Sequence, residues 1–106
     1  ADHVLDVRFL PNPYWVTELR HLTGRDEPVA EYVFRQDGAA EFVDGYAALL
    51  APALPAYIEE LKPNVTIAVG CTGGKHRSVA SAERISARLR ANGFKVSTQH
   101  RDLGRE

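Results

Sequence analysis

The sequence has a single cysteine, Cys71, and no group of cysteine and histidine residues with the spacing of zinc ligands. An internal disulfide is therefore excluded, and we expect no metal site. The longest apolar stretch, Ala47 to Ile58, contains two prolines and is too short to cross a bilayer. No basic segment precedes an apolar core near the amino end, which argues against a signal peptide. We therefore expect a cytoplasmic protein without a membrane partner.

The length and composition are those of one small globular domain. The chain has 106 residues, of which 44% are hydrophobic and 25% are charged. The net charge of -1 conceals an asymmetry. Residues 1–74 carry 5 basic and 11 acidic side chains, whereas residues 75–106 carry 8 basic and 3 acidic ones. A fold that keeps the basic part together would attract anions to it.

The amino-terminal half is expected to be mainly helical after one strand. Alternation in residues 3–9 predicts a strand that the Pro11-Asn12-Pro13 turn ends. A short helix or helical turn is expected over residues 14–22, and Asp26 and Pro28 begin a helix that runs to about residue 36. Residues 39–61 are rich in alanine and leucine and predict a helix, which Pro52 and Pro55 should kink or split.

The carboxy-terminal half predicts a βαβ unit over residues 65–99, with a strand at 65–69 and a tight loop at 70–75. Helical periodicity then begins at residue 76 or 77 and continues to Ala91, where Asn92-Gly93 provides a stop. Alternation in residues 94–99 predicts a further strand, parallel to the first. The fold class expected is α/β, a single small domain with a mainly parallel sheet.

The loop between the strand and the helix carries the residues of an anion site. A strand that leads into a helix directs backbone N–H groups and the positive end of the helix dipole into one concavity. Two glycines allow a ligand to approach the backbone, three cationic side chains follow them, and two hydroxyls flank the set. The expected ligand-binding residues of the loop are Cys71, Thr72, Gly73, Gly74, Lys75, His76, Arg77 and Ser78.

The loop fits one enzymatic pattern and fails another. It is not a Walker A loop, because Lys75 is followed by histidine and no earlier glycine has the right offset. It does fit Cys-x5-Arg, the phosphate loop of cysteine-dependent phosphatases, in which a thiolate attacks phosphorus. On that alternative Cys71 is the nucleophile, and the acid that protonates the leaving group is Asp6, Asp26 or Asp102. The alternative reading of Cys71 is a small apolar side chain in the core.

Four segments of the chain closely resemble the carboxy-terminal domain of the RapZ/YvcJ family. They are DVRFLPNP (residues 6–13), ELRHLTG (18–24), GCTGGKHRS (70–78) and QHRDL (99–103). The resemblance implies a two-domain cytoplasmic protein whose amino-terminal P-loop domain binds and hydrolyses ATP or GTP. That domain is absent from this chain, so residues 1–106 are expected to form the carboxy-terminal ligand-sensing domain alone, without catalysis or a cofactor of its own.

The resemblance implies a sensor of amino sugars. Enterobacterial members bind glucosamine-6-phosphate in this domain, and UDP-linked amino sugars are a reasonable ligand class in other bacteria, where relatives serve cell-envelope precursor metabolism. The implied contacts are Thr72, Gly73, His76 and Arg77, with help from the PNP turn. Asn12 in that turn, and Thr23 and Gly24 in the second motif, complete the expected ligand set. A homodimer or higher homo-oligomer is also expected.

An RNA-binding adapter is the second alternative that the resemblance implies, since enterobacterial members present small RNAs to a ribonuclease. The basic residues that would serve it here are Arg84, Arg88 and Arg101. The tail of this chain lacks the run of lysines and arginines that those members carry. A second difference bears on sugar selectivity: Tyr14 follows the PNP turn where those members have histidine. His100-Arg101-Asp102 is expected to lie beside the pocket or at a subunit contact.

Overall fold

Two short parallel strands form the sheet of this domain. In the computed structural model, which describes residues 1–103, β1 (His3–Asp6) pairs with β2 (Ile67–Gly70) so that His3 lies opposite Ile67 and Asp6 opposite Gly70. Both strands fall where the sequence predicts them, although β1 stops three residues early. There Asp6 accepts the backbone N–H of Arg8, and a turn closes from the Leu10 N–H to the Val7 carbonyl.

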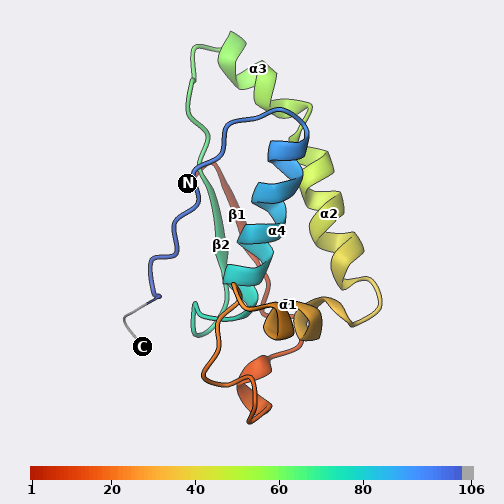
Figure 1. Cartoon of the computed structure of the whole chain (residues 1–106). Coiled ribbons are helices and arrows are strands. Elements are labelled where there is room, and N and C mark those ends of the chain that lie inside the picture. Colours follow the sequence, from red (N-terminus) through yellow and green to blue (C-terminus); the bar gives the residue numbers. More distant parts are fainter. Residues whose placement is uncertain (104–106) are drawn as a thin grey trace.

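The helices form two layers on one side of the sheet (Figure 1). A single 3-10 turn, η1 (Pro13–Trp15), and α1 (Glu27–Phe34) follow β1, and then come α2 (Ala39–Leu50) and α3 (Ala53–Glu59). After β2 comes α4 (Arg77–Ala91), which packs on β2 with one face and on α1 and α2 with the other. The domain is therefore α/β with a parallel sheet, as the sequence predicts.

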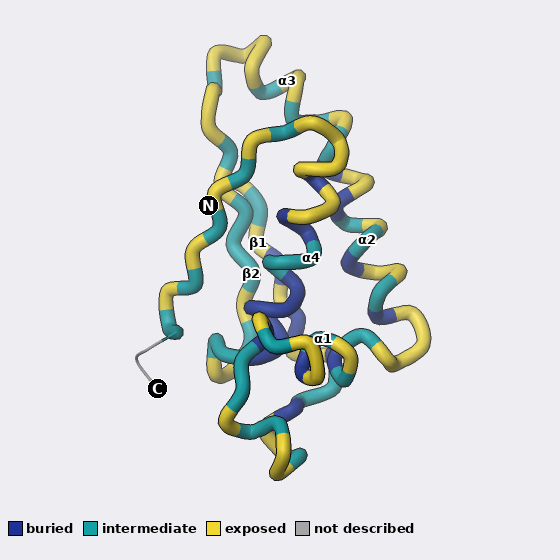
Figure 2. The backbone as a smooth tube through the Cα atoms, in the orientation of Figure 1, coloured by how far each residue is buried: buried dark blue, intermediate teal, exposed yellow. Residues whose placement is uncertain are grey.

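The core surrounds α4, and the buried residues gather along that helix and on the sides of α1 and α2 that face it (Figure 2). Burial of apolar side chains at roughly 25 cal/mol per Å² supplies most of the stabilisation of such a layer. The buried side chains that form the hydrophobic cluster come from β1 and the turn after it and from α1, α2 and α4: Leu5, Val7, Leu10, Val29, Val33, Ala39, Val43, Ala47, Ala80, Ile85 and Leu89.

Most helix ends lie where local signals predict them. Pro52 splits the alanine-rich segment, because α2 ends at Leu50 and α3 begins at Ala53, whereas Pro55 lies in the first turn of α3 and does not break it. Gly93 has a φ of +90° after the end of α4, the left-handed conformation that glycine adopts most readily. Asp26 precedes α1, but its carboxylate accepts the backbone N–H of Thr23 at 2.8 Å and not an amide of the helix.

The expected strand at residues 94–99 is wrong. This segment runs along β2 (Figure 1) but forms no ladder with it. It is held to α4, because Arg90 donates to the carbonyl of Val96 at 2.9 Å and the hydroxyls of Ser86 and Thr98 are 2.6 Å apart. A cavity of about 710 Å³ lies among β2, α4 and residues 94–102. The expected short helix at 14–22 also shortens, to η1 followed by turns.

The described part of the chain has no helix that is both long and apolar enough to span a membrane. Likewise, among residues 1–103 no three histidine, cysteine, aspartate or glutamate side chains lie close enough together to hold a metal ion.

Gly24 joins the 18–24 segment to the first turn of α4. Its N–H donates to the carbonyl of Lys75 at 2.9 Å, and a Cβ at this position would overlap the backbone N of Ala80 and the carbonyl of His76. Because backbone atoms of a helix cannot move aside, a side chain here must push the two segments apart.

We therefore expect Gly24→Ala to lower the free energy of unfolding by about 1–3 kcal/mol, measured by urea denaturation. Gly45→Ala is the matched control, because a Cβ on this exposed glycine of α2 meets nothing within 4 Å. The control should be neutral or stabilising by about 0.5–1 kcal/mol, the gain from alanine in a helix. Equal effects of the two substitutions would contradict the close approach at Gly24.

Candidate functional site

The candidate site that the sequence predicts lies in the loop between β2 and α4. Gly74 has a φ of +69°, which a glycine tolerates and which turns the chain into α4. Thr72 and Gly73 are exposed at the tip of the loop, and a Cβ on Gly73 would meet nothing within 4 Å. The tip is therefore open to a ligand. The inner residues of the loop, Cys71 and Gly74, line the 710 Å³ cavity together with Ser78.

Cys71 marks the point on which the loop donors converge. Its Sγ accepts the backbone N–H of Ser78 at 3.4 Å and is hydrogen-bonded to the Ser78 hydroxyl at 3.3 Å. Burial raises the pKa of this thiol, but the Ser78 hydroxyl, the amides of Ser78 and Gly74, and the charge of Arg77 together outweigh burial and lower the pKa. The loop thus stabilises a negative charge at this position, which is the physical requirement of an anion site.

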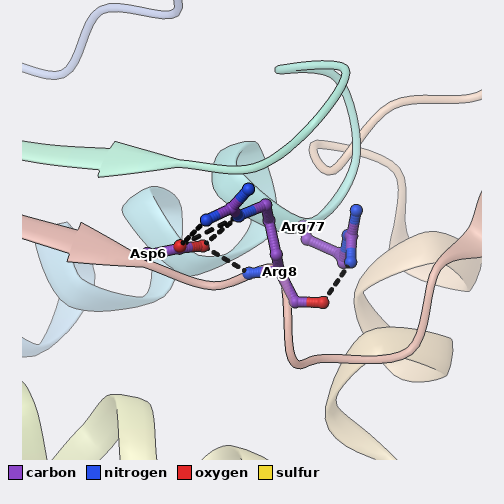
Figure 3. A network of polar contacts seen from close by, with 3 residues as sticks. All are labelled: Asp6, Arg8 and Arg77. Atoms are coloured by element: carbon purple, nitrogen blue, oxygen red, sulfur yellow. Dashed lines mark hydrogen bonds and ion pairs between the residues drawn. The ribbon is translucent and has the colours of Figure 1, made fainter.

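Arg77 is buried and points away from the loop tip toward the end of β1. Its Nη1 donates to the carbonyl oxygens of Arg8 at 2.5 Å and of Leu10 at 3.3 Å, and only 6% of the residue is exposed (Figure 3). Figure 3 also shows that Arg8 folds back on Asp6, with its Nη2 at 2.6 Å from the carboxylate. These hydrogen bonds lower the pKa of Asp6 to about 2. Arg77 therefore positions the loop, and its positive charge contributes to the lowered pKa of Cys71.

The other two expected cations behave differently from each other. His76 is 7% exposed; burial lowers the pKa of its imidazole, a backbone group of Arg20 opposes the change, and the charge of Lys75 adds to it. The lowered pKa favours the neutral form of the His76 ring over the charged form. Its Nε2 is buried without a partner in the described structure. Lys75 is partly exposed and supplies the accessible positive charge of the loop.

The remaining expected ligand residues are engaged in local turns. Asn12 accepts the backbone N–H of Tyr14 at 3.1 Å and so begins η1. The Thr23 hydroxyl accepts the N–H of Arg25 at 3.2 Å, while Gly24 is bonded to the Lys75 carbonyl. The structure therefore brings residues 23–24 to the start of α4. The PNP turn is linked to the start of α4 only indirectly, because Arg77 donates to the carbonyl oxygens of Arg8 and Leu10, which precede that turn in the chain.

Asp102 is the residue that sequence reasoning left outside the ligand set. It lines the same cavity, and its carboxylate lies so close to Gly74 that a Cβ on that glycine would overlap Oδ2 and lie 3.1 Å from Cγ. The sequence offers two indications. The His100-Arg101-Asp102 triplet is expected beside the pocket or at a subunit contact, and Asp102 is one of three candidate acids of the phosphatase alternative. Of these three carboxylates, the structure places that of Asp102 against Gly74 of the loop.

The arginines of the RNA-binding alternative are largely paired with acids. Arg84 and Arg88 both fork onto Asp44 of α2, with Nε–Oδ1 distances of 2.7 and 3.0 Å. Arg84 also lies over the ring of Phe34, 4.9 Å from its centroid. Arg101 is exposed and contacts Asp102 at 3.3 Å. Sharing one carboxylate between two guanidiniums reduces the charge that this face offers to phosphates.

Known proteins match this chain over nearly its whole length. A family model described as the RapZ C-terminal domain matches residues 1–104. Relatives that this chain matches over its full length are each called a nucleotide-binding protein. One from Clavibacter michiganensis subsp. michiganensis is 63% identical, and others from Thermobifida fusca and Streptomyces avermitilis are each 59% identical. The chain spans 37% of the first and 36% of each of the other two.

The hydrogen bond from Ser78 makes the thiol of Cys71 a testable probe of the loop. We expect Ser78→Ala to raise the pKa of Cys71 and slow its alkylation near neutral pH, because the thiolate loses a hydroxyl donor. The pH profile of iodoacetamide labelling measures this directly, since the chain has no other cysteine.

Ser81→Ala is the control for this variant. Ser81 is a buried serine of α4 whose hydroxyl has no partner among the described residues. Its removal should leave the labelling profile unchanged. A Ser78→Ala profile that coincides with both the control and the unmodified protein would disprove the role of Ser78 in stabilising charge.

Proposed function

Because this chain belongs to the family of RapZ C-terminal domains, we propose that it is a sensor domain that binds a phosphorylated or UDP-linked amino sugar at residues 71–78. The observation that carries the proposal is the convergence of the Ser78 and Gly74 donors and the Arg77 charge on one point of the loop, where Ser78 lies 3.3 and 3.4 Å from the sulfur of Cys71 and the pKa of this thiol is lowered. A phosphate oxygen is bound by the same arrangement of amides at the start of a helix.

The space beside the loop suits a ligand larger than phosphate. The cavity of about 710 Å³ falls within the usual size of small-molecule sites, and the loop residues occupy only one part of its wall. The sugar would extend from the loop along β2 and the 94–102 segment. Thr72 and Gly73 at the exposed tip, with Lys75 nearby, would close on the outer phosphate oxygens.

The domain's role in a longer protein is part of the same proposal. The relatives are nearly three times as long as this chain, and the resemblance places an ATP- or GTP-binding P-loop domain in the remaining part. Ligand capture at residues 71–78 would regulate that domain, and through it amino-sugar and cell-envelope precursor metabolism, in a homodimer or higher homo-oligomer. This domain would act by binding and not by catalysis.

Calorimetric titration with glucosamine-6-phosphate, UDP-N-acetylglucosamine and inorganic phosphate tests the proposal. At least one of the two sugars should bind more tightly than phosphate. Lys75→Gln should weaken that binding about threefold to fivefold, the effect of one partly exposed charge. Arg35→Gln removes the same charge from the exposed end of α1, outside the 71–78 loop, and should have no effect. No heat with any of the three ligands would reject the proposal.

Phosphatase chemistry is a second candidate that one observation favours. The Cys71–Ser78 hydrogen bond and the lowered pKa of the thiol are what a cysteine nucleophile requires. The thiolate would form a bond to phosphorus as the ester P–O bond breaks, and water would then release phosphate. One observation opposes this candidate. The Nη1 of Arg77 donates to the carbonyl oxygens of Arg8 and Leu10, so this nitrogen does not point toward a phosphate at Cys71.

Turnover of p-nitrophenyl phosphate separates the two candidates. A pure sensor should give no turnover above buffer, and Cys71→Ser should leave ligand affinity within about threefold, because Ser78 and the loop amides remain. Turnover in the unmodified protein that Cys71→Ser abolishes would establish the phosphatase instead.

A further inference from the structure

The cavity beside the 71–78 loop is long and has three walls. β2 and α4 form two of them, and residues 94–102 form the third. This third wall runs back along α4 from its last turn to its first. The N–H of Phe94 donates to the carbonyl of Leu89 near the end of the helix, and the carboxylate of Asp102 lies against Gly74, just before the helix begins. The cavity therefore has one end at the loop and a far end beside the last turn of α4.

The two ends are well separated. Ser78 and Leu89 both line the cavity, in the first and last turns of α4. They lie about 16 Å apart, because an α-helix rises about 1.5 Å per residue. β2 runs along the cavity, with Ile67 at the far end and Gly70 at the loop. A phosphate bound at the Cys71–Ser78 end therefore leaves the greater part of the cavity unfilled.

The lining changes from polar to apolar with distance from the loop. In the third wall alternate residues are half-buried: Asp102, His100 and Thr98 come first from the loop, and Val96 and Phe94 follow. The last two also pack against the hydrophobic core. The other apolar side chains at the far end come from α3, from α4 and from β2 with the residues before it: Leu54, Ile58, Val65, Ile67 and Leu89.

Part of this apolar lining is in contact with water. Ile58 is 63% exposed, and none of the residues of α3 is buried. Two lysines line the same end, Lys62, whose ammonium is paired with Asp2 at 3.1 Å, and the exposed Lys95. Their stems are apolar, so they extend the lining without burying a charge. A hydrocarbon group that covered Ile58 would remove apolar surface from water, which is favourable in proportion to the area buried.

We infer that the far end of the cavity is a subsite for a hydrocarbon group, so that this domain takes an amphiphilic phosphate with an alkyl or isoprenoid tail. The phosphate lies at the Cys71–Ser78 end, and the tail lies among the apolar side chains of α3, β2 and residues 94–96. The inference rests on the proposed function for the phosphate, and it goes beyond that function because neither an amino sugar nor a uridine carries such a tail. A narrow chain fits between three walls, whereas the face of a second folded domain does not.

A series of alkyl phosphates tests the inference by calorimetry in a buffer without phosphate or sulfate. The ligands are inorganic phosphate, butyl phosphate, octyl phosphate and octan-1-ol, each at concentrations where light scattering detects no micelles. Each methylene that leaves water strengthens binding about threefold to fourfold, so octyl phosphate should bind at least about tenfold more tightly than butyl phosphate. Octan-1-ol, which lacks the phosphate, should bind more weakly than octyl phosphate.

Variants of Ile58 locate the tail. Ile58→Asn should weaken the binding of octyl phosphate about threefold to tenfold and change that of butyl phosphate less than about twofold. Ile58→Ala removes most of the same apolar surface and favours the helix, so an equal loss in both variants is not a folding defect. Leu49→Asn is the matched control, because Leu49 is a 73% exposed side chain of α2 that does not line the cavity. It should leave both affinities unchanged.

The outcomes separate this inference from the function on which it rests. Equal affinity for butyl and octyl phosphate overturns the inference alone, provided that glucosamine-6-phosphate or UDP-N-acetylglucosamine binds. A chain-length effect that survives in both Ile58 variants also overturns it, as does octan-1-ol that binds as tightly as octyl phosphate. Sedimentation with vesicles of phosphatidic acid and phosphatidylcholine, without binding of dissolved octyl phosphate, overturns it in favour of a bilayer surface. A chain-length effect without binding of either sugar supports the subsite and rejects the sugar.

Discussion

The buried guanidinium of Arg77 holds the start of α4 at the end of β1, and the geometry of the loop depends on that hold. Its partners are the carbonyl oxygens of Arg8 and Leu10, which have left the sheet ladder and would otherwise lack donors. These partners are neutral, so the positive charge is solvated but not cancelled. It is felt at Cys71, where it helps to lower the pKa of the thiol, and at Asp6. One side chain thus joins the strand, the loop and the charge of the site.

The site that results is polarised along its length. Buried positive charge and helix amides lie at its base, burial lowers the pKa of the His76 imidazole, and the carboxylate of Asp102 lines its wall. An arrangement of this kind suits recognition better than chemistry, because the arginine that would contact a reacting phosphoryl group is already committed to the backbone. RNA binding is also less well supported, because Arg84 and Arg88 share the carboxylate of Asp44 and offer less positive charge to phosphates.

Local signals in the sequence account for much of the fold. The start of α4 after His76, its stop at Gly93 and the break at Pro52 each depend on a few adjacent residues, and the sequence predicts each of them. The end of β1 at Asp6 is different, because the predicted strand continues to residue 9. The strand expected at 94–99 failed for the opposite reason. Alternation shows which side chains share a face, but a strand also requires an unpaired neighbour at hydrogen-bonding distance, and here side chains of α4 hold the segment away from β2.

The sequence by itself determined that a strand leads through a glycine-containing loop into a helix, and hence that amides and cations gather there, because that arrangement follows from residues close together in the chain. Only the tertiary structure decided what each charge does. Arg77 turns inward and the pKa of His76 is lowered because segments far away in the sequence bury them, and Asp102 reaches Gly74 because the chain folds back after α4. Burial and pairing between distant residues set the charge and direction of a side chain, and no local pattern contains that information.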